Sequence, residues 1–211
     1  MRRKIVPATK LIALLFSALI IIPVSALAQT SSDAAQVTPP TSAAAAGQHD
    51  FDSLAGTWKA HTKYRAHPFA PSDPWIDFDG TETFSKIWDG ALLEVSAGAN
   101  TNGPVGLMLY TYNPQSHQWS VYFASKKDGK VGLPNVGEFR NGQGEFFVQD
   151  TLNGKSMLNR YIWSQTASSS PHFEESWSAD GGRTWQTVRI VDLARIGEGP
   201  TNAHPAGNSE P

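Results

Sequence analysis

The stretch that decides the fold reads HDFDSLAGTW and runs from His49 to Trp58. Within it, Asp50 to Leu54 is the one helical candidate of the domain, a single turn that we expect to plug one end of the fold. Gly56-Thr57-Trp58 follows directly and opens the first expected strand. The stretch therefore predicts a domain of β-strands in which one short helical turn precedes the first strand and covers one end.

The sequence between His49 and Ile196 continues in short strands. No part of it keeps a 3.6-residue apolar period for three turns, while runs rich in aromatic and β-branched residues recur between turn dipeptides such as Asn141-Gly142 and Asn153-Gly154. Such turns join neighbouring antiparallel strands, so we expect an all-β, up-and-down barrel of about ten strands, because closure leaves no strand edge unpaired. A β-sandwich is the alternative. The expected strands are Thr57 to Arg65, Gly80 to Ile87, Ala91 to Ala97, Gly106 to Tyr112, Gln118 to Ser125, Val136 to Arg140, Gly144 to Gln149, Ser156 to Ser164, His172 to Ser178 and Thr184 to Leu193.

The first 28 residues are typical of a bacterial signal peptide. Three basic residues at positions 2–4 precede an almost wholly apolar run from Leu11 to Ile22, and Ala26-Leu27-Ala28 offers the small residues that a signal peptidase recognises. We therefore expect export to the periplasm or secretion, with no stable membrane anchor left after cleavage. An uncleaved anchor is the alternative, because the apolar run approaches the length of a bilayer span.

The segments on either side of the barrel are poor in apolar residues. Residues 29–47 are mostly Ala, Ser, Thr, Gln and Pro, and residues 197–211 contain three prolines. Neither segment can bury enough apolar area to offset its ordering entropy. We predict a disordered spacer, a barrel over residues 48–196 and a disordered tail.

Composition excludes several classes of function. The chain has no cysteine, which rules out disulfides, thiol chemistry and cysteine-ligated metal sites. Acids slightly outnumber bases, with a formal net charge of −2, and no basic stripe follows the strands, so we expect no nucleic-acid partner.

Two motifs together resemble those of a family of bacterial exported lipocalin-like proteins. Gly56-Thr57-Trp58 matches the G-x-W signature of lipocalin-type barrels, and Ser178 to Trp185 supplies the second motif near the end of the domain. The likeness covers nearly all of the domain. It implies a calycin-like barrel with an inner cavity, in which Trp58 packs across the closed end, and it implies no agreed activity.

The second motif, SADGGRTW from Ser178 to Trp185, fits the Asp-box pattern S-x-D-x-G-x-T-W of sialidase propellers. Asp180 can accept backbone N–H bonds across the turn, the two glycines supply positive φ, and Trp185 packs beneath. The box occurs once, in a chain too short for a propeller. It therefore predicts a fold-stabilising turn rather than a glycosidase.

This turn also predicts how the two strands that it joins are paired. If Trp177 and Trp185 face one another, then Phe173 lies opposite Arg189, and Glu175 becomes the diagonal neighbour of Arg189 on the same face. Two charges on an aromatic-rich face are costly unless they pair with each other or with a ligand. An ion pair at the barrel rim and a polar anchor inside a cavity stay open as interpretations.

Seven tryptophans and nine phenylalanines outside the signal peptide are more than so small a core needs. We therefore predict a carrier or sensor that binds a small apolar or amphipathic molecule inside the barrel. Two alternatives remain: an isomerase, cyclase or hydrolase that uses Glu175 as acid or base and Arg189 as charge stabiliser, and a structural envelope module. The candidate ligand-binding residues are Asn159, Tyr161, Trp163, Phe173, Glu175 and Arg189.

No motif assigns a catalytic residue, a metal or a cofactor. The six histidines are scattered, without a pair at metal-ligand spacing, and the chain has no nucleophile elbow, P-loop or dinucleotide fingerprint. A single haem-ligating histidine, as some small β-barrels use, stays open.

The longest connector of the domain runs from His67 to Asp77 and contains three prolines. Proline fixes the backbone and removes a ladder donor, so the connector should be stiff and irregular. It is either a lid that carries Phe69 and Trp75 over one mouth of the barrel or an ordinary connection packed on the outside.

Overall fold

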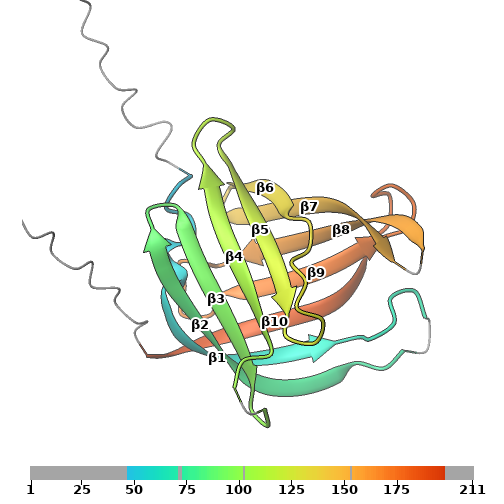
Figure 1. Cartoon of the computed structure of the whole chain (residues 1–211), viewed down its shortest axis with the longest axis horizontal. Helices are drawn as coiled ribbons and strands as arrows, with labels where there is room; N and C mark the ends of the chain where they lie inside the picture. Colours follow the sequence, from blue (N-terminus) through green and yellow to red (C-terminus); the bar gives the residue numbers. More distant parts are fainter. Residues whose placement is uncertain (1–46, 71–72, 102, 153, 198–211) are drawn as a thin grey trace, which may run out of the picture. The chain divides into compact units, whose positions relative to one another are not determined.

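The computed structural model describes residues 47–70, 73–101, 103–152 and 154–197, and these residues form one short 3-10 helix and ten β-strands (Figure 1). The predicted signal peptide, and nearly all of the predicted spacer and tail, lie outside the described residues. The described part of the chain contains no helix of the length and apolar character that a bilayer span requires. The elements are η1 Asp52–Leu54, β1 Gly56–Tyr64, β2 Ile76–Trp88, β3 Ala91–Gly98, β4 Gly106–Asn113, β5 Gln118–Ser125, β6 Asn135–Arg140, β7 Gln143–Leu152, β8 Lys155–Ser164, β9 His172–Ser178 and β10 Gln186–Gly197.

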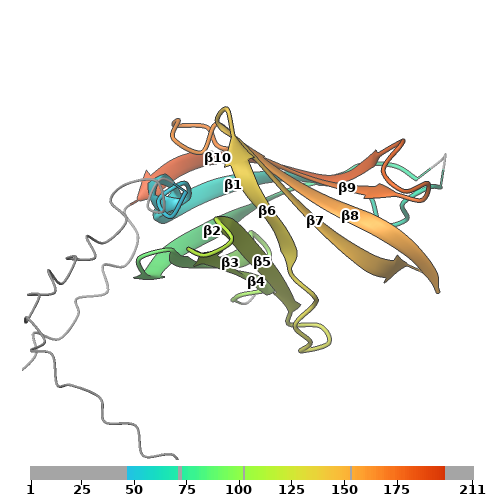
Figure 2. The same cartoon turned by 90° about the horizontal axis from the view of Figure 1, so that it is seen from above.

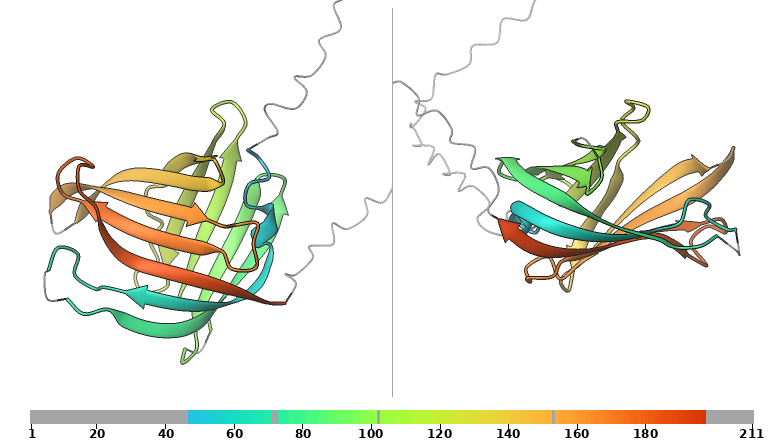
Figure 3. Two further views of the ribbon diagram at one scale, coloured as in Figure 1. Left: turned by 180° about the vertical axis from the view of Figure 1, so that it is seen from behind. Right: turned by 90° about the horizontal axis from the view of Figure 1, so that it is seen from below.

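The strands close into one antiparallel barrel in up-and-down order. Each strand pairs with the next along the chain, and β10 returns to pair with β1. In Figure 2 β6 crosses between the group of β2 to β5 and the group of β7 to β10, and the left view of Figure 3 shows β10, in red, next to β1. The arrangement confirms the predicted all-β, lipocalin-like barrel and excludes the sandwich.

Most strand bounds agree with the prediction to within one or two residues, and three strands differ by more: β7 continues three residues beyond the predicted Gln149, to Leu152, and β2 and β10 differ as follows. β2 begins at Ile76 rather than Gly80, because its first residues pair with the end of β1, and the prolines before it concealed this extension. β10 begins two residues later than expected and continues to Gly197, where it pairs with Thr57. Gly47, predicted to lie in the spacer, contacts the barrel, since its carbonyl accepts a 2.9 Å hydrogen bond from Trp119 Nε1.

A plug of aromatic and aliphatic side chains fills one end of the barrel. Phe51, Leu54 and Trp58 are fully buried there, and Trp58 Nε1 donates a 2.7 Å hydrogen bond to the Leu54 carbonyl. The helix begins two residues later than predicted and spans Asp52–Leu54. Its position at the closed end of the barrel agrees with the expectation for both the turn and Trp58.

Arg195 ties this plug to the last strand. Its guanidinium stacks on the Trp58 ring at 4.1 Å and donates hydrogen bonds to the carbonyls of Ser53 and Ala55. Because a guanidinium presents several donors in a rigid plane, one side chain can hold both the helix and the first strand.

The turn between β9 and β10 is held by side-chain hydrogen bonds, as the Asp-box pattern predicts. Asp180 Oδ1 accepts from the Thr184 N–H at 2.9 Å and from Ser178 Oγ at 2.8 Å, while Oδ2 accepts from Thr184 Oγ1 at 2.7 Å. Gly181 and Gly182 have the expected positive φ. The backbone and hydroxyl bonds from Thr184 hold the pKa of Asp180 well below its usual range.

Replacing Asp180 with alanine should lower the thermal midpoint at neutral pH, because three hydrogen bonds of this turn are lost. The folded-state pKa is depressed, so the stabilisation is complete above the unfolded pKa of about 4 and is lost as the pH falls below it. The difference in thermal midpoint between the variant and wild type should therefore become smaller below about pH 4, in thermal melts recorded across a pH series. Asp128→Ala is the control, because within the described part of the chain the Asp128 carboxyl accepts a single 3.3 Å bond, from the Lys130 N–H. A midpoint equal to that of wild type at pH 7 would contradict the assignment.

Candidate functional site

A cavity of about 540 Å³ occupies the barrel beyond the plug. Each of the ten strands contributes at least one residue to its wall. The volume falls within the range of pockets that hold small ligands. Of the described residues between β1 and β2, Arg65, Ala66 and Pro68 line the cavity, whereas Phe69 and Trp75 of the lid interpretation do not.

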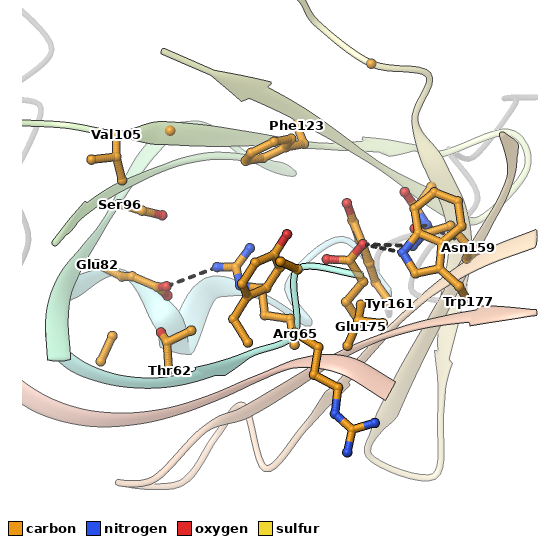
Figure 4. Close-up of a pocket in the computed structure, with 18 of the residues that line it drawn as sticks. Thr62, Arg65, Glu82, Ser96, Val105, Phe123, Asn159, Tyr161, Glu175 and Trp177 are labelled. Carbon is orange, nitrogen blue, oxygen red and sulfur yellow. Dashed lines mark hydrogen bonds and ion pairs between the residues drawn. The ribbon is translucent and has the colours of Figure 1, made fainter. Parts of the chain in front are cut away.

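One side of the cavity is apolar. Figure 4 shows Val105 and Phe123 across the cavity from Glu175 and Trp177. The ladder between β5 and β6 is short, with three residue pairs. Phe123 on β5 and Leu133, just before β6, both line the cavity. Other apolar residues are spread around the wall, since Val148 lies opposite Asn159 in strand register and Val188 precedes Arg189; Tyr64, Phe78 and Leu152 also line the cavity.

The opposite side carries a polar cluster built around Glu175. Its Oε1 accepts a 2.9 Å hydrogen bond from Asn159 Nδ2 and a 3.0 Å bond from Trp177 Nε1 (Figure 4). Asn159 is fixed in turn, because its Oδ1 accepts a 2.8 Å bond from Asn135 Nδ2. Burial raises the pKa of Glu175, although Arg189 and the two donors act in the other direction. The carboxyl is therefore held in one orientation on the wall.

A second charged group lies deeper, around Arg189. Its Nη2 is 3.5 Å from Glu82 Oε1, and the buried Glu94 accepts a 2.5 Å bond from the Tyr110 hydroxyl. Burial, reinforced by the charge of Glu94, raises the pKa of Glu82 to about 8. Three carboxyl groups thus share the barrel interior with the guanidinium of Arg189.

The predicted register across the Asp-box turn is wrong, although both charges do share a face. Trp177 pairs with Gln186, and an irregularity between Thr187 and Arg189 brings Arg189 directly opposite Glu175 rather than Phe173. Trp177 lines the cavity, whereas the Trp185 ring packs against Phe147 and under the Arg160 guanidinium. An added residue in one strand shifts all later pairs, and the sequence gives no sign of it.

The structure brings together four of the six predicted ligand-binding residues: Asn159, Tyr161, Glu175 and Arg189 all line the cavity. Trp163 and Phe173 do not. Their rings pack 5.1 Å apart in the core, where they are 1% and 2% exposed.

Sequence reasoning missed Glu82, Glu94, Asn135 and Trp177 as parts of the site. A signal was present for two of them, because alternation places Glu82 on the face of the buried Phe84, and Glu94 on the face of the buried Leu92. Arg189 lies within ion-pair distance of Glu82, at 3.5 Å, whereas the sequence leaves open an ion pair of Arg189 with Glu175 or a polar anchor in the cavity.

Within the described ranges, no group of three or more histidine, aspartate or glutamate side chains could hold a metal ion. Neither a protein-family model nor a curated protein matches this chain. The resemblance to exported lipocalin-like proteins thus stays a prediction from its two motifs.

Proposed function

We propose that the protein binds a small amphipathic molecule in the barrel cavity. The observation that carries the proposal is the cavity itself, with an apolar wall facing a hydrogen-bonded polar cluster. Burying polar groups costs free energy unless they are satisfied, and a ligand with one polar end would complete the cluster while its apolar part covers Phe123 and Val105. Together with the predicted signal peptide, this makes the protein an exported carrier or sensor.

Filling the cavity with a larger side chain should weaken the binding of a neutral apolar dye. Val105 lines the cavity, so Val105→Trp should weaken Nile red binding by about tenfold or more, measured by fluorescence titration. Val131→Trp is the matched control, because Val131 is 68% exposed and does not line the cavity. Equal affinities of the two variants would place the dye elsewhere and contradict the proposal.

The natural ligand can be sought directly. The purified protein is incubated with cell extract, washed, and extracted with solvent, and the released molecules are identified by mass spectrometry. Val105→Trp treated in the same way is the control. A molecule enriched on wild type alone supports the proposal, and identical extracts from the two proteins count against it.

Acid–base catalysis is a second candidate, favoured by the raised pKa of Glu175 on the wall of an accessible cavity. An isomerase, cyclase or hydrolase could use this carboxyl, with Arg189 stabilising developing charge. Glu175→Gln should then abolish turnover in an activity screen and leave Nile red binding intact. Turnover unaffected by the substitution would remove the catalytic role.

A further inference from the structure

The acidic residues on the cavity wall are not all paired with basic ones. Arg189 stands directly opposite Glu175 in the strand register, yet its guanidinium pairs with Glu82. Arg65, the other cation that lines the cavity, stacks on the Trp75 ring at 4.5 Å. Among the described side chains Glu175 forms no ion pair, and both of its hydrogen bonds go to Oε1. Two carboxyls on the wall, those of Glu175 and Asp150, therefore have no ion-pair partner among the described residues, and Glu175 is the one inside the hydrogen-bonded cluster.

An anionic ligand fits this cavity poorly. A carboxylate seeking Arg189 would approach a guanidinium that already interacts electrostatically with Glu82, Glu94 and Glu175. An anion would therefore compete with these acids for the guanidinium, whose Nη2 already lies 3.5 Å from Glu82 Oε1. A cation beside Glu175 meets a carboxyl that forms no ion pair among the described residues.

Two aromatic side chains lie close to the Glu175 carboxyl. Tyr161 lies directly opposite Glu175 in the register of β8 with β9, and Trp177 is two residues further along β9; both line the cavity (Figure 4). A cation over a tryptophan or tyrosine face is attracted by the ring quadrupole, and aromatic groups combined with a carboxylate favour ammonium ligands. Asn159 and Trp177 already orient the Glu175 carboxyl, so a ligand that binds it pays little additional entropy for ordering this side chain.

We propose that the ligand is a cationic amphiphile, an alkyl amine or quaternary ammonium; this inference rests on the proposed function. Its head lies against the Glu175 carboxylate and the Trp177 ring, and its apolar tail runs along Phe123 and Val105. The ammonium supplies the counter-charge that Glu175 lacks, so the carboxyl ionises in the complex.

Four ligands with the same twelve-carbon tail test this class. Dodecyltrimethylammonium, dodecylamine, dodecanol and dodecanoate are titrated, below their micelle concentrations, against the protein loaded with Nile red. Both cations should displace the dye at concentrations at least about tenfold lower than dodecanoate, with dodecanol between them. Dodecanoate as strong as the cations would overturn the ligand class and leave the proposed function standing. No binding of Nile red or of any of the four would overturn the proposed function.

Two substitutions locate the head group. Glu175→Gln should weaken both cations at least about tenfold and leave dodecanol within about threefold of wild type. Glu174→Gln is the matched control, because Glu174 lies on the outer face of the same strand and contacts His172. Retained Nile red binding shows that each variant is folded. Equal losses for the cations and dodecanol, or no loss for the cations, would remove Glu175 from the site.

Discussion

Replacing Phe51 with alanine is expected to lower the free energy of unfolding by about 3 to 5 kcal/mol. The ring is fully buried in the plug, and its centroid lies within 5.0 Å of the ring centroids of Tyr110, Trp119 and Phe139. These neighbours belong to different strands, so they cannot all move inward to fill the space that the substitution leaves.

Urea unfolding followed by tryptophan fluorescence measures this loss. Phe69→Ala is the control, because Phe69 is 38% exposed and should change the free energy by less than about 1 kcal/mol. A loss below about 1 kcal/mol for Phe51→Ala would show that the barrel is stable without its plug.

Replacing Glu82 with glutamine should remove a large part of the pH dependence of stability. The folded-state pKa is raised from 4.5 to about 8, so between these values the folded protein binds the proton that the unfolded chain has released. The stability that protonated Glu82 contributes is complete below pH 4.5, the pKa of Glu82 in the unfolded chain, and is lost as the pH rises towards 8. Glutamine stays neutral, so at pH 8 the variant should exceed wild type by on the order of a few kcal/mol.

The groups that face Glu82 are Glu94 from β3 and Arg189 from β10. Both remain in the variant, so the difference between the two unfolding curves isolates Glu82. Urea titrations at pH 5 and pH 8 give the comparison, with Glu138→Gln, a surface carboxyl paired with Arg140, as control. Parallel losses of stability in wild type and Glu82→Gln would contradict the assignment.

The strand order and the closed end could be predicted because their determinants are local. Turn dipeptides such as Asn141-Gly142 separate runs of alternating apolar residues, and the segment from Phe51 to Trp58 carries the plug beside the first strand. The pairing of β9 with β10 could not be predicted in the same way. The irregularity before Arg189 depends on how β10 pairs with both of its neighbours, which no single strand encodes.

The candidate site could be predicted in part, for a related reason. Alternation assigns a side chain to the inner face, and this brought Asn159 and Glu175 into the predicted site. Alternation says nothing about depth along the barrel axis. Trp163 shares a strand face with Asn159, yet it lies in the packed core while Asn159 reaches the cavity.

The pairing of β1 with β10 joins the two ends of the domain, and this places the barrel among slow-folding topologies. A contact between such distant residues forms only after the loop-closure entropy of nearly the whole domain has been overcome. Until β10 is in place, β1 and β9 each present an unpaired edge that can associate with another chain. Arg195 lies on β10, stacks on the Trp58 ring and donates to the carbonyls of Ser53 and Ala55. The pairing of β10 therefore closes the barrel and stabilises the plug in the same step.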